Sequence, residues 1–174
     1  MFDNIVSIVN KPRVSKMIKG MYWGLAAFIG CIGLIFLSLG ILTPMGNAGF
    51  IAGSLILVFV EPILLLIIAS LYRTRYILSD SDLLIRTTIL IGGDKRIPLD
   101  EVESVEKTLI PFGIRFFGAS FHGGHYRIPG LGRSFIAMTN FEDGLLIRTK
   151  HRNYIITPRD PEDFKEALEL KIHS

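Results

Sequence analysis

The stretch that decides the fold is MYWGLAAFIGCIGLIFLSLGIL at residues 21–42, in which no side chain is charged. A second apolar run, FIAGSLILVFVEPILLLIIASL at residues 50–71, contains a single charged residue, Glu61. Each run is about as long as a helix that crosses a hydrocarbon core of roughly 30 Å. A cleavable signal peptide would have a shorter apolar stretch. We therefore predict a hairpin of two retained transmembrane helices, over residues 21–42 and 50–71.

The positive charges around these runs predict the orientation of the hairpin. The basic residues before the first run are Lys11, Arg13, Lys16 and Lys19. Arg73 and Arg75 follow the second run, whereas the connecting residues 43–49 carry no charge. Because Lys and Arg beside membrane spans stay on the cytoplasmic side, we predict a multi-pass protein of the plasma membrane with both termini in the cytoplasm. Residues 1–20 would form a basic tail that contacts anionic membrane lipids.

Glu61 and Pro62 are unusual inside the second predicted helix. A charged side chain near the middle of a membrane costs about 2.5–3.5 kcal/mol or more. Pro62 has no N–H to donate to the carbonyl of Val58, so we expect a kink there. Counting inward from the outer loop places Glu61 opposite residues 30–33. Two interpretations stay open: a functional polar site that holds a proton, a cation or a partner's helix, or a protonated acid bonded to backbone freed by the kink.

Beyond Arg75 the apolar residues alternate with polar ones, which is typical of β-strands. Turn residues at 79–82, 92–94 and 142–144 separate the alternating segments. We predict short strands over residues 76–78, 83–91, 95–98, 102–107, 134–139, 145–149 and 154–157.

A single helix is predicted at the C-terminus. Asp160 is placed to act as its N-cap and Pro161 as its first residue, and Glu162 and Asp163 follow in the first turn. The apolar residues that fall on one face of this helix are Phe164, Ala167, Leu168 and Ile172. That face is expected to close one end of a curved antiparallel sheet.

Several motifs in the same order resemble a known family. They read YILSDSDLLIR at 76–86, RIPLDEVESV at 96–105, FGAS at 117–120, PGLG at 129–132 and IITPRDPEDF at 155–164. Together they are similar to the bacterial and archaeal pleckstrin-homology-like (PH-like) domains that follow membrane helices. The resemblance covers about residues 73–171.

This resemblance implies a fold rather than a chemistry. We expect a membrane α-helical hairpin at residues 21–72 and a cytoplasmic α+β domain at residues 73–174, built as a PH-like antiparallel β-barrel or sandwich capped by the C-terminal helix. Eukaryotic relatives that bind phosphoinositides carry Lys and Arg around the first hairpin loop. In this chain that loop, residues 79–82, is acidic, so inositol phosphate binding is not carried over.

The segment 111–132 is the most unusual part of the expected domain, because it combines six glycines with a group of aromatic residues. A long loop of this kind is often functional, although its aromatics could instead fill one mouth of the barrel. Basic residues also accumulate between residues 107 and 159. The residues that we predict to contact a membrane surface or a partner are Arg73, Arg75, Arg115, Phe116, Phe117, Phe121, Tyr126, Arg127 and Arg133.

Other classes of function receive little support from the sequence. Residues 72–174 contain 15 Lys and Arg against 14 Asp and Glu, whereas a nucleic-acid-binding domain is usually strongly basic. His122 and His125 lack a third ligand nearby for a metal. We find no nucleophile–base pair and no phosphate-binding loop, and expect neither an enzyme nor a cofactor nor a small-molecule substrate.

We therefore predict a membrane-anchored scaffold or adaptor that binds a protein partner, a second copy of itself or the anionic membrane surface. The alternative is an accessory or sensory subunit of a membrane complex, in which Glu61 makes an intramembrane contact.

Overall fold

A computed structural model describes residues 8–43, 46–89, 91–109, 114–117, 123–140 and 142–173 of the chain. The chain divides into two compact units. One is helical and contains residues 16–69, and the other contains residues 1–15 together with residues 70–174. Each unit is described by itself.

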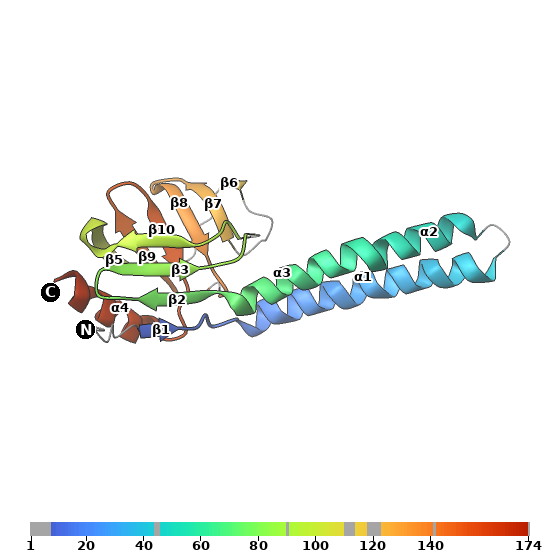
Figure 1. The fold of residues 1–174 in the computed structure, drawn as a ribbon, viewed down its shortest axis with the longest axis horizontal. Helices are drawn as coiled ribbons and strands as arrows, with labels where there is room; N and C mark the ends of the chain where they lie inside the picture. The colour runs from blue at the N-terminus through green and yellow to red at the C-terminus, as the bar shows by residue number, and fades with distance from the viewer. Residues whose placement is uncertain are drawn as a thin grey trace, which may run out of the picture. The chain divides into compact units, whose positions relative to one another are not determined.

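Two antiparallel helical segments make up the first unit (Figure 1). The first is α1, Lys16–Leu42. The second runs from Asn47 to Arg73 and consists of α2 (Asn47–Leu55), a π-helical segment (Ile56–Val60) and α3 (Glu61–Arg73). Both segments are long and apolar enough to cross a membrane. Most of their large apolar side chains are exposed, which suits an apolar environment around the helices.

Glycines allow close contact between α1 and α2. A Cβ added at Gly53 would lie 2.5 Å from the backbone nitrogen of Leu37, and one at Gly49 would lie 3.0 Å from the carbonyl oxygen of Phe36. Small residues at this spacing let helix backbones approach one another. By contrast, Cβ atoms at Gly20 and Gly24 would meet nothing within 4 Å. The close packing of the two helical segments is therefore found at Gly49 and Gly53 and not at Gly20 and Gly24.

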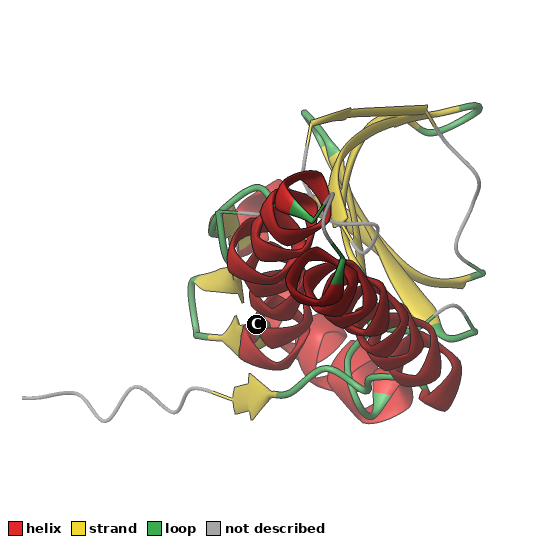
Figure 2. Ribbon diagram, turned by 90° about the vertical axis from the view of Figure 1, so that its right-hand side faces the viewer, coloured by secondary structure: helices red, strands yellow, loops and turns green. Residues whose placement is uncertain are grey.

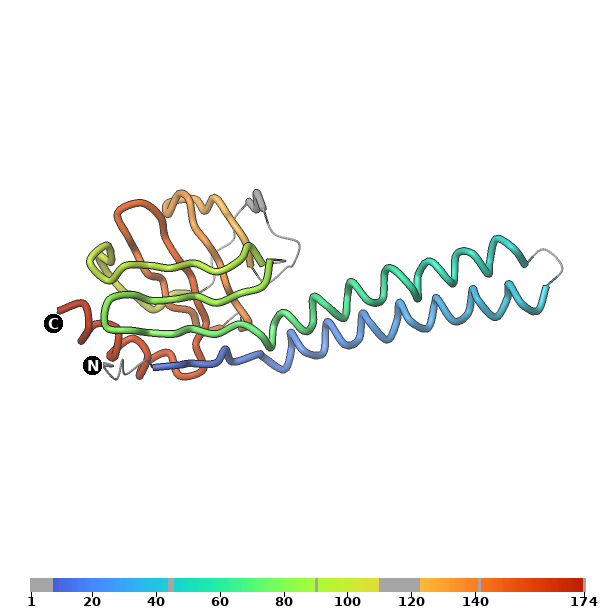
Figure 3. Tube along the Cα trace, viewed as in Figure 1, coloured from blue at the N-terminus to red at the C-terminus, as the bar shows by residue number. Residues whose placement is uncertain are grey.

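The first sheet of the β-rich unit has four antiparallel strands in the order β1-β2-β3-β4. Its strands are β1 (Ile8–Asn10), β2 (Arg75–Leu78), β3 (Asp82–Arg86) and β4 (Lys95–Pro98). Part of the segment predicted as a basic N-terminal tail, residues 1–20, thus belongs to the folded unit. The N-terminal strand lies beside β2 (Figure 3), and the hydroxyl of Thr139 donates to the carbonyl of Arg13.

The second sheet has six strands in the order β5-β9-β10-β8-β7-β6 and is strongly curved (Figure 2). Its strands are β5 (Val102–Thr108), β6 (Ile114–Phe117), β7 (Gly123–Ile128), β8 (Gly132–Ala137), β9 (Gly144–Thr149) and β10 (Asn153–Ile156). β10 inserts between β9 and β8 and runs parallel to β8. The sheet is therefore mixed rather than wholly antiparallel as predicted. The described part of the predicted loop, 111–132, contains both β6 and β7.

The main hydrophobic core contains apolar residues of both sheets and of α4, Pro161–Ile172. Phe164 and Leu168 are buried in this core, and Ala167 and Ile172 pack against it, as the sequence predicts. Asp160 occupies the N-cap position, although its side chain makes no capping hydrogen bond. A second cluster, on the opposite face of the six-stranded sheet because strand side chains alternate, contains Ile128, Ile136, Met138, Leu146 and Ile155.

Candidate binding site

The candidate site is a basic pocket at one end of β7, β8 and β10. The register of β7 and β8 places Arg127 directly opposite Arg133, and His125 directly opposite Phe135. Side chains on opposed residues of paired strands project from the same face of a sheet. Phe135 belongs to the main core, so this face is the one that continues into that core.

Arg152 reaches the same face from the turn between β9 and β10. The Thr149 hydroxyl accepts from the Arg152 backbone N–H at 3.2 Å and donates to the Arg152 carbonyl at 2.7 Å, which fixes the turn. The guanidinium of Arg152 lies 3.3 Å from Nδ1 of His125. Because an arginine can only donate, Nδ1 of His125 must be the acceptor, and the imidazole is neutral in this arrangement.

The floor of this group of cations is aromatic. Phe135 is 0% exposed, and its ring centroid lies 5.2 Å from that of His125 and 6.3 Å from that of Tyr154. Nζ of Lys95 lies 5.0 Å from the centroid of the Phe135 ring, within the range of a cation–π interaction. The same ammonium donates to the carbonyl of Gly92 at 2.6 Å.

Gly92 brings the turn between β3 and β4 over this aromatic floor. Its φ is +123°, a conformation that residues with a Cβ rarely adopt. A Cβ at this position would lie 3.0 Å from Cε2 of Phe135 and 3.8 Å from Cδ2 of His125. Glycine is therefore required here for both its backbone conformation and its small size.

Positive charge is concentrated around His125 and Lys95, and burial together with this charge lowers the pKa of both. Burial, followed by Arg152 and Lys95, lowers the pKa of His125. Burial and Arg152 also lower the pKa of Lys95, although Asp94 acts in the opposite direction. Within the part of the chain that the structure describes, the ion pairs with carboxylates include none made by Arg127, Arg133 or Arg152.

His125 and the three arginines line a pocket of about 350 Å³. The residues that line it are His125, Tyr126, Arg127, Arg133, Ser134 and Arg152. Such a hollow is large enough for one or two side chains or a small anion. It offers guanidinium groups, which bind carboxylates and phosphates through paired hydrogen bonds.

Three residues predicted as contacts therefore lie together: Tyr126, Arg127 and Arg133. Tyr126 is half-buried, and its side chain packs against the second apolar cluster, so its role is at least partly structural. Arg127 and Arg133 are exposed. Arg152, Lys95 and His125 were not predicted as contacts, and only Arg152 stood among the basic residues that accumulate along this part of the sequence.

The other predicted contacts are placed differently. Arg73 is exposed at the end of α3, and the guanidinium of Arg75 donates to the carbonyls of Tyr72 and Thr74, each at 2.6 Å. Arg115, Phe116 and Phe117 belong to β6, whose backbone pairs with β7. The side chains of these three residues, and all of Phe121 and His122, lie outside the described residues.

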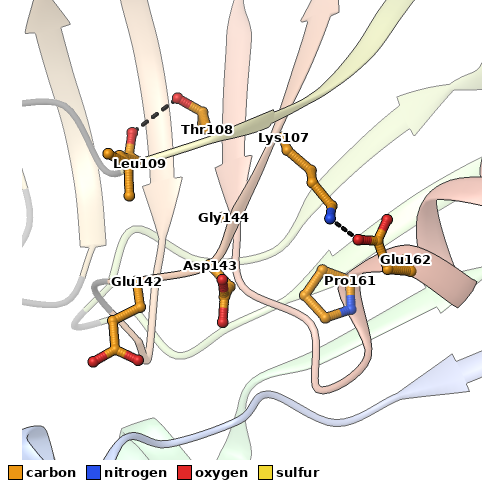
Figure 4. A pocket seen from close by; sticks show the side chains of 8 residues that line it. All are labelled: Lys107, Thr108, Leu109, Glu142, Asp143, Gly144, Pro161 and Glu162. Atoms are coloured by element: carbon orange, nitrogen blue, oxygen red, sulfur yellow. Dashed lines mark hydrogen bonds and ion pairs between the residues drawn. The ribbon is translucent and has the colours of Figure 1, made fainter.

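A second pocket, of about 450 Å³, has the opposite character (Figure 4). It lies where the end of β5, the start of β9 and the N-terminus of α4 meet. Lys107 forms an ion pair with Glu162, while the side chains of Glu142 and Asp143 are directed away from that pair (Figure 4). Lys107, the lysine that lines this pocket, therefore already has a carboxylate partner. Among the described residues, no group of three or more His, Cys, Asp and Glu could hold a metal ion.

The helical unit contains a separate polar feature at Glu61. Its backbone N–H donates to the carbonyl of Ile56, five residues earlier, and Pro62 supplies no N–H. The carbonyls of Leu57 and Val58 therefore lose their usual α-helical donors, which explains the π-helical segment. A Cβ added at Gly30 would lie 4.0 Å from the carboxyl carbon of Glu61, so the acid lies beside the part of α1 that counting from the loop predicts.

One oxygen of the Glu61 carboxyl group is buried without a partner in the described part of the chain. Its Oε2 atom is buried, and among the described residues it has no hydrogen-bond partner. Pro62 is exposed beside it. An unsatisfied buried oxygen costs about 1–3 kcal/mol, so this position needs a further explanation in terms of a proton or a partner.

The comparisons with known families agree with the architecture. A family model described as a bacterial PH domain matches residues 74–172, which include most of the β-rich unit. The chain belongs to the bacterial PH domain family. A second model with the same description matches residues 25–120 and so includes most of α1 and all of α2 and α3 of this PH-domain protein. No curated protein and no solved structure gives a significant match.

Family membership confirms the resemblance seen in the sequence motifs. It also indicates a general class of function. Bacterial PH domains are typically non-catalytic binding modules. Membership therefore suggests a binding or scaffold role for the β-rich unit, which we refer to as the PH domain.

Proposed function

We propose that this chain is a membrane-anchored, non-catalytic scaffold whose PH domain binds a protein partner through the basic pocket. The observation that carries the proposal is the convergence of Arg127, Arg133 and Arg152 on one face without carboxylate partners among the described residues. A cluster of like charges is unfavourable for folding alone, so it is best explained by a ligand of opposite charge.

A protein partner accounts for the pocket better than a flat anionic membrane surface. Arg127 and Arg133 are exposed at the rim, but Arg152 and His125 are half-buried. A flat layer of headgroups would contact the exposed pair only, whereas a protruding side chain of a partner can reach the recessed pair as well. Tyr126, which also lines the pocket and is half-buried, adds an aromatic ring against which the stem of such a side chain can pack.

The anchor in this proposal is the pair of apolar helical segments. Both are long and apolar enough to cross a membrane, and their exposed apolar side chains would be stable in lipid. The basic residues at the inner ends, such as Lys19 and Arg73, favour a hairpin with both chain termini and the PH domain in the cytoplasm of the cell.

Purification of the full-length chain in a mild detergent tests the proposal. The variant Arg127→Gln/Arg133→Gln removes two rim charges, and Lys107→Gln/Arg148→Gln removes two basic residues that are already paired with Glu162 and Glu106. We expect a stoichiometric protein partner, identified by mass spectrometry, to be lost only from the rim variant. Equal recovery of every co-purified protein with both variants would contradict the proposal.

A second candidate function is favoured by the buried, unpartnered Oε2 atom of Glu61. In this alternative the chain is an accessory or sensory subunit of a membrane complex, and Glu61 bonds a polar group of a partner's membrane helix. Interhelical hydrogen bonds of this kind contribute about 0.6–2 kcal/mol. A membrane partner lost with Glu61→Leu but retained with Glu61→Gln would support this function. Retention with both variants would exclude it.

A further inference from the structure

The opposed pair Arg127 and Arg133 is the starting point. These residues face each other across neighbouring strands, where Cβ atoms are about 5 Å apart and like charges are destabilising. Other basic residues of the domain avoid this cost, because Arg96 pairs with Asp82 and Arg148 pairs with Glu106. An oxyanion between the two guanidinium groups would convert the repulsion into attraction.

In the same pocket, the hydrogen bond between Arg152 and His125 depends on the protonation state of the imidazole. The neutral imidazole accepts from Arg152 through Nδ1. If His125 gains a proton at Nδ1, this bond is lost and two cations lie side by side. Protonation is therefore unfavourable in the empty pocket and becomes favourable when an anion is present.

We propose that the pocket binds the carboxylates of an acidic segment of a partner protein, and that this binding is coupled to the uptake of one proton by His125. This inference rests on the proposed protein-binding function. It adds the class of ligand that the basic pocket binds and the way in which pH regulates that binding. Arg127 and Arg133 would clamp one carboxylate at the rim, and protonated His125 would donate to the ligand from within the pocket.

The cations that act on His125 favour this direction. Arg152 approaches from the β9–β10 turn, Lys95 from β4, and Arg127 and Arg133 from β7 and β8. Of the acidic groups, Asp94 acts on Lys95 and Glu101 acts on Tyr154. The remaining neighbour, β6, carries Arg115, whose side chain lies outside the described residues. The nearby cations therefore disfavour protonation of His125, and a bound carboxylate would offset their effect.

A direct test is the binding of a fluorescent peptide of alternating glutamate and serine to the full chain in uncharged detergent micelles. Fluorescence anisotropy would be measured at about pH 6 and about pH 8, where glutamate stays ionised but histidine titrates. The matching glutamine–serine peptide controls for contacts that do not need charge, and vesicles of phosphatidylglycerol serve as the lipid probe.

We expect the glutamate peptide to bind severalfold more tightly at the lower pH. Arg133→Gln should weaken binding about tenfold, whereas Arg159→Gln, which removes an exposed charge outside the pocket lining, should not. His125→Asn should abolish the pH dependence, since an asparagine carbonyl can still accept from Arg152 but does not titrate.

Failure of the inference and failure of the proposed function give different results. Binding that depends on Arg133 but is equal at both pH values, or whose pH dependence survives His125→Asn, would overturn the proton coupling and leave the protein-binding scaffold intact. Binding of phosphatidylglycerol vesicles in place of the peptide, or no discrimination between the two peptides, would overturn both.

Discussion

Two hollows of similar size lie on the PH domain, and charge balance sets them apart. The larger, of about 450 Å³, contains a lysine that Glu162 neutralises, whereas the smaller, of about 350 Å³, gathers three arginines without carboxylate partners among the described residues. We refer to them as the paired pocket and the basic pocket. The paired pocket is also lined by Glu142 and Asp143, which make no ion pair among the described residues. The two pockets therefore differ in the sign of the charge that the fold leaves uncompensated, and only the basic pocket suits an acidic ligand.

The largest expected contrast is in the loss of stability when an apolar residue beside each pocket is replaced by alanine. Phe135 under the basic pocket is 0% exposed, and Leu109 at the paired pocket is 76% exposed. Phe135→Ala should lower the free energy of unfolding by about 3–5 kcal/mol, while Leu109→Ala should change it by less than about 0.5 kcal/mol. Thermal or urea unfolding of the full chain in detergent measures both, and equal effects would contradict the assignment of Phe135 to the core.

A smaller contrast is expected between two adjacent glycines. Gly92→Ala forces a Cβ to a φ of +123° and to 3.0 Å from Phe135, whereas at Gly93, with a φ of +72°, a Cβ meets nothing within 4 Å. We expect a loss of about 1–3 kcal/mol at Gly92 and about 1–2 kcal/mol at Gly93. If Gly93→Ala proves the more damaging in the same unfolding measurement, the close approach of this turn to the basic pocket is wrong.

Neutralising one cation in each pocket should have opposite effects on stability. Arg133→Gln relieves the repulsion with Arg127 and should raise the free energy of unfolding by about 0.2–1 kcal/mol. Lys107→Gln removes the partner of Glu162 and should lower that free energy by about 0–1 kcal/mol. Measurements at low salt give the largest difference. Changes of the same sign would remove the distinction between the two pockets.

The smallest expected effect is the dependence of stability on pH. Burial and the neighbouring cations lower the pKa of His125 in the folded chain, so the unfolded chain binds more protons below its ordinary pKa of about 6.5. The contribution of His125 to stability is complete above about pH 6.5 and is lost as the pH falls through the lower folded pKa. His125→Asn should flatten this part of the pH profile. A profile that does not change would show that His125 is not perturbed.

Much of the fold could be predicted from local patterns. The two apolar segments needed only composition and length. β4 agrees with its predicted range because the turn residues at 92–94 mark where it begins. β1 was missed because its three residues gain their order from β2, which lies far along the chain. β6 and β7 were missed because their glycines and adjacent aromatics do not alternate as strands usually do.

The candidate site was less predictable, because it depends on which strands are neighbours. Arg127 and Arg133 could be selected from a basic and aromatic segment, but nothing local indicates that β7 and β8 place them opposite each other. Arg152 joins His125 only because β10 inserts beside β8 in parallel orientation. Lys95 arrives through the turn at Gly92. Such contacts follow from tertiary topology rather than from residue spacing.

The central claim is that the basic pocket, and not the paired pocket, binds an acidic protein segment. Photo-cross-linking of the full chain in its native membrane tests it, with a photoreactive residue placed either at Pro129, on the exposed turn between β7 and β8, or at Leu109. We predict a protein adduct from position 129 that excess glutamate–serine peptide suppresses, and no such adduct from position 109. Equal adducts from both positions, or an adduct at 129 that the acidic peptide does not reduce, would contradict the account.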